Sequence, residues 1–271
     1  MVSRTSTTNP LDFAALSAAT YGIAAQPTKF GAKVAHALEV IEEAIGTYGP
    51  SRIALSFNGG KDCTVLMHLL RAALYRTSTP KASASGGRAA LPLLSLYVVS
   101  SKAFAEMDDF VEESVGRYRL QLVREGGGMR QGLEEFKASF PHVQAIFVGT
   151  RRDDPHGKNL DFFSPTDNGW PEFTRVNPVL DWSFDDIWEF IRSADVHYCG
   201  LYNQGYTSLG DVDETVRNPA LCERDGVYRP AWSLKNCDLE RHGRTSNMTV
   251  SPLPIAQVAG TQAVSEQQMA R

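Results

Sequence analysis

Short apolar runs alternate with amphipathic stretches through the first two thirds of the chain. The run at 53–57 is typical of a buried strand. Similar runs predict further strands at 93–99, 119–123 and 144–148. Apolar residues at helical spacing predict helices at 33–48, from 62 or 64 to 74, at 104–115 and at 129–139. Four strand–helix repeats predict an α/β fold with a doubly wound, mostly parallel sheet and helices on both faces, followed by an irregular C-terminal extension.

The ends of the chain lack this pattern. Residues 1–29 are small and polar with few apolar anchors, which predicts a loosely held N-terminal arm. The Ser-, Gln- and Ala-rich residues 245–271 predict a weakly ordered tail. Residues 30–244 remain as the folded domain. Within it, 77–90 has the composition of a surface linker that tolerates insertion.

Composition narrows the class of protein. The chain has 271 residues, 42% of them hydrophobic, and a net charge of −4, so no global basic field recruits nucleic acid. No apolar run approaches the ~18 residues that cross a bilayer, so we expect no membrane partner. The four cysteines are far apart and form no C-x-x-C pair, as expected of reduced thiols. We therefore expect the protein to be cytoplasmic.

The end of the first strand carries the clearest candidate chemistry. Asn58, Gly59 and Gly60 follow the strand and precede a helix, so free helix N–H groups and the positive dipole end face the turn. Lys61 adds a mobile cation, and Asp62 a carboxylate suited to Mg²⁺. An ordinary turn with exposed charges is the alternative. Phosphate binding is favoured because the charges lie at the junction itself.

This turn does not match a Walker A loop, which needs four residues between its glycines. The run from Ser56 through Asp62 to Cys63 resembles the PP-loop of the ATP-pyrophosphatase and sulfonucleotide-reductase superfamily. Within that superfamily it is most similar to eukaryotic FMN adenylyltransferases, the FAD synthases. We expect Cys63 to be buried and not a nucleophile.

A second charged segment follows the strand at 144–148. Arg151, Arg152, Asp153 and Asp154 provide a phosphate clamp and acceptors for the N–H groups of a planar ring. Carboxyl ends of parallel strands share one edge, so this segment should lie beside the turn at 58–62. A solvated charge run is the alternative. The aromatic loop that follows, 162–171, is of a kind that covers a ligand.

Sequence blocks at 149–155, 164–171, 177–182, 187–190, 199–210, 230–232 and 239–244 occur in the order found in eukaryotic FAD synthases. The resemblance spans 53–244. It implies transfer of AMP from ATP to the phosphate of FMN, forming FAD and pyrophosphate, with Mg²⁺ required. It also implies a PAPS-reductase-like fold. Asp153 stands where that family commonly has Thr. FAD could be delivered transiently to apo-flavoproteins.

The resemblance also assigns residues by position. The catalytic set it implies is Asn58, Asp62, Arg241 and Arg244, with Asp62 as the metal ligand. The ATP or phosphate set is Ser56, Phe57, Gly59, Gly60, Lys61 and Arg151. The flavin set is Asp154, Arg152, Asp167 and Trp170. A spacing of three places Arg241 and Arg244 on one side of a helical turn, if such a turn forms.

Two other functions remain open. A sulfonucleotide reductase would use a reactive cysteine in a Glu-Cys-Gly-like context, whereas Cys237 follows Lys235-Asn236 and precedes Asp238. A non-catalytic flavin or nucleotide carrier would tolerate loss of Asp62, and an enzyme would not. Bacterial bifunctional FAD synthases use a His-x-Gly-His signature that this chain lacks.

Overall fold

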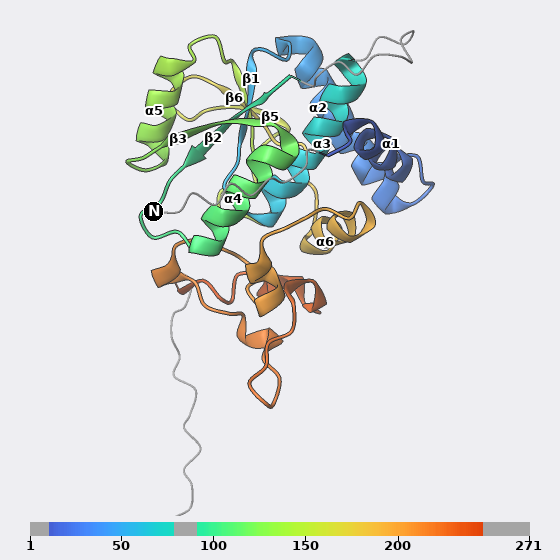
Figure 1. Ribbon diagram of the computed structural model, residues 1–271, viewed down its shortest axis with the longest axis vertical. Helices are drawn as coiled ribbons and strands as arrows, with labels where there is room; N and C mark the ends of the chain where they lie inside the picture. The colour runs from blue at the N-terminus through green and yellow to red at the C-terminus, as the bar shows by residue number, and fades with distance from the viewer. Residues whose placement is uncertain (1–10, 79–90, 246–271) are drawn as a thin grey trace, which may run out of the picture.

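The computed structural model describes residues 11–78 and 91–245. Its centre is a six-stranded sheet in the order β3-β2-β1-β4-β6-β5 (Figure 1). The strands are β1 (Ile53–Ser56), β2 (Leu93–Val98), β3 (Leu120–Glu125), β4 (Ala145–Phe147), β5 (Phe163–Pro165) and β6 (Thr174–Val176). The helices are α1 (Phe13–Ala24), α2 (Lys29–Tyr48), α3 (Lys61–Ser78), α4 (Ala105–Tyr118), α5 (Met129–Ser139) and α6 (Phe184–Ser193).

β1 lies in the interior of the sheet, as its apolar run predicts. It pairs in parallel with β2 on one side and β4 on the other. Successive side chains of a strand point to opposite faces. Ile53 and Leu55 accordingly join the larger core cluster, whereas Ala54 joins the smaller one. Burial on both faces explains why the strand is apolar without alternation.

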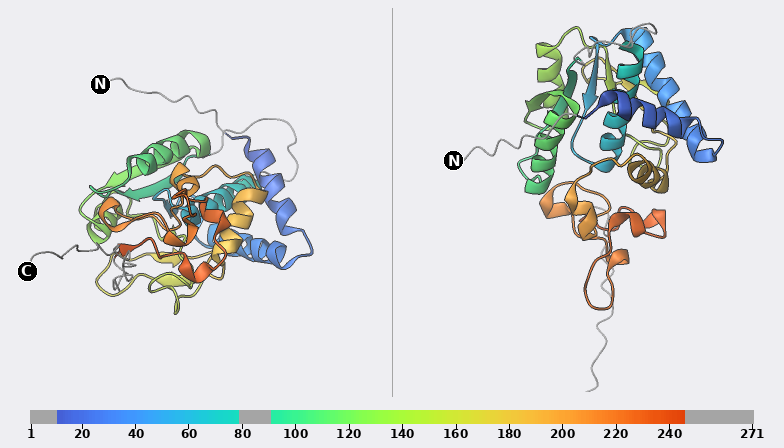
Figure 2. Two further views of the ribbon diagram at one scale, coloured as in Figure 1. Left: turned by 90° about the horizontal axis from the view of Figure 1, so that it is seen from below. Right: turned by 45° about the vertical axis from the view of Figure 1, so that its right-hand side comes forward.

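Helices cover both faces, which confirms the doubly wound architecture. The larger core packs the sheet against residues of α1, α2, α3, α4 and α6, and the smaller core packs it against α5. Figure 2 shows α1 and α2 on the opposite side of the sheet from α5. The helix predicted at 129–139 matches α5. α6 begins with a capping box between Ser183 and Asp186.

The prediction of a loosely held N-terminal arm is wrong for residues 13–24. They form α1. Asp12 is the N-cap of this helix, and its side chain accepts hydrogen bonds from Ala14 N and Ala15 N. One face of α1 is buried against α3, and Ser17 Oγ donates to Ala72 O at 3.0 Å. Residues 1–10 lie outside the described part of the chain, as do 79–90 of the predicted linker and 246–271 of the predicted tail.

The predicted aromatic loop contains structure that its sequence did not indicate. β5 lies within this segment and β6 follows it, and the two strands pair antiparallel at one edge of the sheet. β6 continues the parallel sheet beside β4. Each strand has three residues, too few for a periodic pattern.

Residues beyond α6 form an irregular extension, as predicted, built from short 3₁₀ turns. It lies below the sheet in Figure 1, against the edge where β1 ends. No helix in the described residues is both long and apolar enough to cross a membrane.

Candidate active site

The turn between β1 and α3 has the strand, glycine turn and helix N-terminus that the sequence predicts. Gly59 has φ +77°, and a Cβ there would lie 3.1 Å from Val111 Cγ2, so glycine is required for conformation and space. Asn58 Oδ1 accepts a hydrogen bond from Gly60 N at 3.0 Å. The first N–H groups of α3 have no carbonyl partner within the helix, which makes this end suited to an anion.

Lys61 is held firmly, so the prediction of a mobile cation is wrong. Its side chain is 3% exposed, and its Nζ lies 3.0 Å from Asp62 Oδ2 and 2.6 Å from Glu240 Oε1. Its backbone N–H donates to the Tyr202 hydroxyl at 2.9 Å. Burial lowers the pKa of Lys61, but the two carboxylates outweigh it and raise the pKa overall. Burial raises the pKa of Asp62, but the neighbouring Lys61 and Arg151 charges lower it overall.

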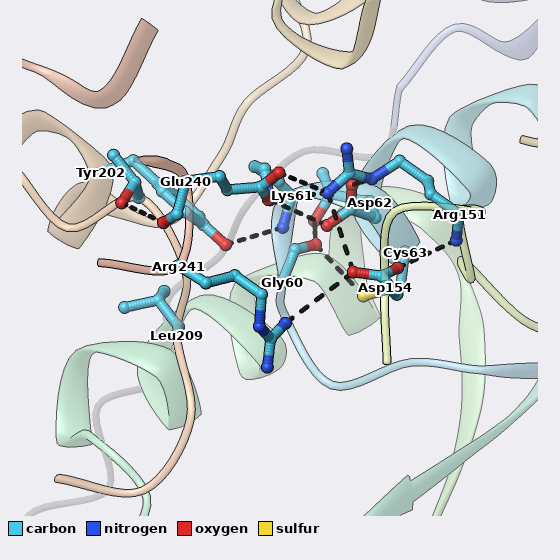
Figure 3. Close-up of polar contacts among 12 residues, drawn as sticks. Gly60, Lys61, Asp62, Cys63, Arg151, Asp154, Tyr202, Leu209, Glu240 and Arg241 are labelled. Atoms are coloured by element: carbon cyan, nitrogen blue, oxygen red, sulfur yellow. Dashed lines mark hydrogen bonds and ion pairs between the residues drawn. The ribbon is translucent and has the colours of Figure 1, made fainter. Parts of the chain in front are cut away.

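Arg151 joins the second charged segment to this turn, which confirms that the two share one edge. Its side chain is 1% exposed, with Nε 2.7 Å from Asp62 Oδ1. Nη2 donates to both carboxylate oxygens of Glu240 at 2.7 Å. Gly149 permits the approach, because a Cβ there would lie 2.8 Å from Cys63 N. Lys61, Asp62, Arg151, Asp154, Glu240 and Arg241 together form what we call the charge cluster (Figure 3).

Asp154 lies at the outer side of the charge cluster. Its Oδ2 accepts from Arg151 N at 2.9 Å, and its Oδ1 lies 3.8 Å from Arg241 Nη1. Partial burial raises the pKa of Asp154, although the Arg151 N–H and charge oppose this effect. The Asp154 carboxylate therefore lies between a buried guanidinium and a more exposed one.

Arg244 lies next to Arg241 on a tight turn. Arg244 N donates to Arg241 O at 2.9 Å. The two arginines therefore lie on a hydrogen-bonded turn and not on a longer helix. Arg244 Nη1 donates to Leu209 O at 2.9 Å. A Cβ on Gly210 would lie 2.2 Å from Arg244 Nη2, so this guanidinium lies directly over the glycine. Burial and the nearby Arg241 charge lower the pKa of Arg244.

Ser56 and Phe57 do not contribute side chains to the charge cluster. Ser56 is the last residue of β1 and is partly buried. The Phe57 side chain is fully buried and packs against Phe110, with ring centroids 6.4 Å apart. The prediction that Phe57 contacts phosphate is therefore wrong for its side chain.

Three residues of the predicted flavin set also lie outside the charge cluster. Arg152 pairs with Asp181, and its Nη1 donates to a loop carbonyl. Asp167 is exposed and pairs with Arg175 at 3.2 Å. Trp170 is partly buried, and its backbone N–H donates to Asp167 O at 3.0 Å. These contacts fix the segment that follows Asp154.

Glu240 and Tyr202 are site residues that sequence reasoning missed. Glu240 contacts Lys61 across 179 positions of sequence, and Tyr202 contacts it across 141. No spacing rule links residues so far apart. The available signal was that Glu240 directly precedes Arg241, within a block that already matched the family.

A cavity of about 600 Å³ lies between α4 and residues 195–203. Its acidic and basic lining residues are Glu106, Asp109, Glu113, Asp195, Arg117 and His197. None of its lining residues belongs to the charge cluster.

Cys63 is buried, as predicted. Its Sγ lies 2.9 Å from Asn58 Oδ1 and 3.1 Å from Gly60 O, and burial raises its pKa to about 12. This thiol is therefore protonated at pH 8 and is a poor nucleophile. We expect iodoacetamide to label the exposed Cys222 of the folded protein and to leave Cys63 unmodified, as read by peptide mass spectrometry. Cys222→Ser should remove the fast labelling; rapid modification of Cys63 would contradict the buried assignment.

Carboxylates that could hold a metal ion are few. In the described residues, no three His, Cys, Asp or Glu side chains gather into a metal site. Asp62 Oδ1 is buried and has no hydrogen-bond partner in the described residues, although Arg151 Nε lies 2.7 Å away. Mg²⁺ is commonly held by one or two carboxylates together with phosphate oxygens and water. Asp62 fits a site of that kind and does not fit an all-protein cage.

The chain is similar to known proteins over most of its length. The family model of the phosphoadenosine phosphosulfate reductase domain matches residues 52–217. A probable FAD synthase of Schizosaccharomyces pombe is 43% identical over 214 residues, which cover 79% of each chain. A probable FAD synthase of Caenorhabditis elegans is 37% identical over 80% of this chain, but over only 41% of that longer protein. The crystal structure of Candida glabrata FMN adenylyltransferase in complex with FAD and inorganic pyrophosphate superposes with a TM-score of 0.74. It is 27% identical, and the match covers 86% of this chain and 99% of that one.

Proposed function

The chain belongs to the family of eukaryotic FAD synthases, and from that premise we propose that it transfers AMP from ATP to FMN, forming FAD and pyrophosphate. The observation that carries the proposal is the charge cluster. It joins the β1–α3 turn, the segment after β4 and the C-terminal turn at one edge of the sheet. Cations and helix N–H groups meet there, as a reaction between phosphates requires.

The FMN phosphate is the nucleophile, and it is already ionised at neutral pH. The protein therefore needs no covalent intermediate, and positioning with charge neutralisation suffices. The positive dipole end of α3 attracts the nucleotide phosphates, while the Gly60 and Lys61 N–H groups hold the turn in shape through Asn58 Oδ1 and the Tyr202 hydroxyl. Arg241 and Arg244 bind the phosphates at which bonds form and break during the transfer. This arrangement agrees with a family whose structure holds FAD and pyrophosphate together.

Asp62 would supply one carboxylate ligand to Mg²⁺ held together with the nucleotide phosphates. When bound, the ion neutralises charge on the phosphate oxygens. Lys61 and Arg151 hold Asp62 from two sides, so its carboxylate is ionised and fixed in direction before the substrates arrive. Residues 30–244 with α1 constitute the catalytic domain, and the protein acts in the cytoplasm. FAD could pass from it to apo-flavoproteins.

Asp154 binds the flavin ring in this proposal. Its carboxylate can accept from flavin N3–H, a charge-assisted bond of ~1.5–3 kcal/mol. Arg152, Asp167 and Trp170 remain the further flavin candidates, from the segment that follows it.

We expect Asp154→Ala to raise the KM for FMN by roughly tenfold or more and the KM for ATP by roughly threefold at most. Steady-state kinetics with each substrate varied in turn measures this difference. The adjacent, exposed Asp153 offers the matched control, and Asp153→Ala should change neither KM. An equal rise in both KM values would remove Asp154 from the flavin site.

The proposal is tested by incubating the protein with FMN, ATP and Mg²⁺ and separating the flavins by chromatography. FAD should accumulate. A sulfonucleotide reductase would instead release sulfite from adenylylsulfate and thioredoxin. Cys237 is unsuited to that reaction, because burial and the neighbouring Asp185 raise its pKa to about 11. A non-catalytic carrier would bind FMN or ATP and form no FAD.

A further inference from the structure

Glu240 connects the C-terminal segment to the two buried cations of the site. Its side chain is 10% exposed, and both of its carboxylate oxygens are occupied. Oε1 accepts from Lys61 Nζ at 2.6 Å and from Arg151 Nη2 at 2.7 Å, and Oε2 accepts from the same Nη2 at 2.7 Å. Figure 3 shows this carboxylate pointing toward Lys61 and Arg151.

The charges explain why a second carboxylate is needed. Lys61 and Arg151 carry two positive charges that are almost completely withdrawn from water. Asp62 neutralises one of them. A buried charge is tolerated only when it is paired, so Glu240 balances the second.

The backbone that carries Glu240 is fixed from behind. Thr207 Oγ1 donates to Glu240 O at 2.6 Å. Asn218 Nδ2 donates to Thr207 Oγ1 at 2.8 Å and to Leu239 O at 2.7 Å. Thr207 and Asn218 are themselves buried. The position of Glu240 is therefore built into the extension and does not depend on a mobile surface side chain.

The contact also determines which donors are free. Glu240 occupies Nη2 of Arg151, whereas the buried Nη1 has no hydrogen-bond partner among the described residues. The next residue along the chain is Arg241, whose Nη1 approaches Asp154. One side chain thus orients Arg151 and sets the place of Arg241.

We propose that Glu240 is a positioning residue for adenylyl transfer, one that holds Lys61 and Arg151 at the phosphate turn and anchors Arg241 beside Asp154. This inference rests on the proposed function. It assigns the C-terminal extension the task of completing the phosphate site. Glu240 touches the cations and not the reacting phosphates, so its effect reaches the reaction through Lys61, Arg151 and Arg241.

Glu240→Gln preserves the shape of the side chain and removes its charge. The site then gains one positive charge and Lys61 keeps Asp62 as its only charged partner, so pyrophosphate should bind at least about threefold more tightly. Lys61 and Arg151 are then held by Asp62 without the Glu240 carboxylate and are less firmly oriented, so kcat for FAD formation should fall roughly tenfold. Isothermal titration with pyrophosphate and steady-state FAD formation measure the two effects. Glu223→Gln is the control, because Glu223 is an exposed residue of the same extension and should change neither value.

Thr207→Val provides the second variant. It removes the hydrogen bond to Glu240 O and the one that Thr207 Oγ1 accepts from Asn218 Nδ2, and it alters no charge. We therefore expect kcat to fall roughly threefold while pyrophosphate affinity stays the same. If Glu240→Gln does not fold, Thr207→Val tests whether Glu240 is a positioning residue.

Opposite effects on pyrophosphate affinity and kcat would support the inference, since a merely structural residue would not produce them. Wild-type values for both in Glu240→Gln, or a parallel loss of both, would overturn it. An unchanged kcat in Thr207→Val would overturn the anchoring role. Absence of FAD formation by the wild-type protein would defeat the proposed function instead. The pyrophosphate titration would then decide the Glu240 inference, because unchanged affinity in Glu240→Gln contradicts it.

Discussion

Replacement of Arg241 or Arg244 by alanine is expected to lower kcat/KM for FAD formation by roughly 10²-fold. Negative charge gathers on the α-phosphate and on the departing pyrophosphate during transfer. A guanidinium placed there stabilises the transition state more than the bound substrates. Arg241 and Arg244 lie on one hydrogen-bonded turn, and the Arg241 charge adds to burial in lowering the pKa of Arg244.

The measurement is steady-state FAD formation with thermal melting alongside. Lysine at either position should restore only part of the activity, because it lacks the planar fork of arginine. Arg229→Ala is the control, as Arg229 is a more exposed arginine of the same extension that pairs with Glu223. Near-normal turnover in both the Arg241 and Arg244 variants would make these arginines surface charge and leave Arg151 as the guanidinium of the site.

Asp62→Asn is expected to reduce kcat by roughly 10²-fold or more. The substitution removes the carboxylate proposed for Mg²⁺ and leaves Lys61 and Arg151 to share Glu240. Breaking a buried pair by removing one partner typically costs about 3–5 kcal/mol, so the melting temperature should fall as well. Turnover is therefore measured at a temperature where the variant is fully folded.

Glu106→Gln separates the proposed role of Asp62 from helix capping. Glu106 is an exposed acid in the first turn of α4, as Asp62 is an acid in the first turn of α3. Loss of a favourable charge near a helix dipole costs about 0.3–1 kcal/mol and should leave catalysis unchanged. Wild-type turnover in Asp62→Asn would return Asp62 to that lesser role.

The fold was largely predictable because its signals are local. The apolar run of β1, the glycines after it and the helical spacing of α3 all lie within one continuous stretch. α1 gave no such signal, because it is built largely from small residues. Those residues allow close packing on α3, as the contact of Ser17 with Ala72 shows.

The sequence predicted which residues belong to the site better than it predicted the contacts between them. Sheet topology alone places Arg151 beside Asp62, since both follow parallel strands at one edge. The state of Lys61 depends on Glu240, which arrives from the far end of the chain. A lysine that looks like a free cation in sequence is therefore buried in a neutral cluster, and only the tertiary structure shows the partner responsible.

The most direct test of adenylyl transfer follows the phosphates of ATP. The purified protein is incubated with FMN, Mg²⁺ and ATP labelled either at the α-phosphate or at the γ-phosphate. The α-label should appear in FAD and the γ-label in pyrophosphate, in equal amounts and only when FMN is present. Labelled AMP or ADP without labelled FAD would contradict the account.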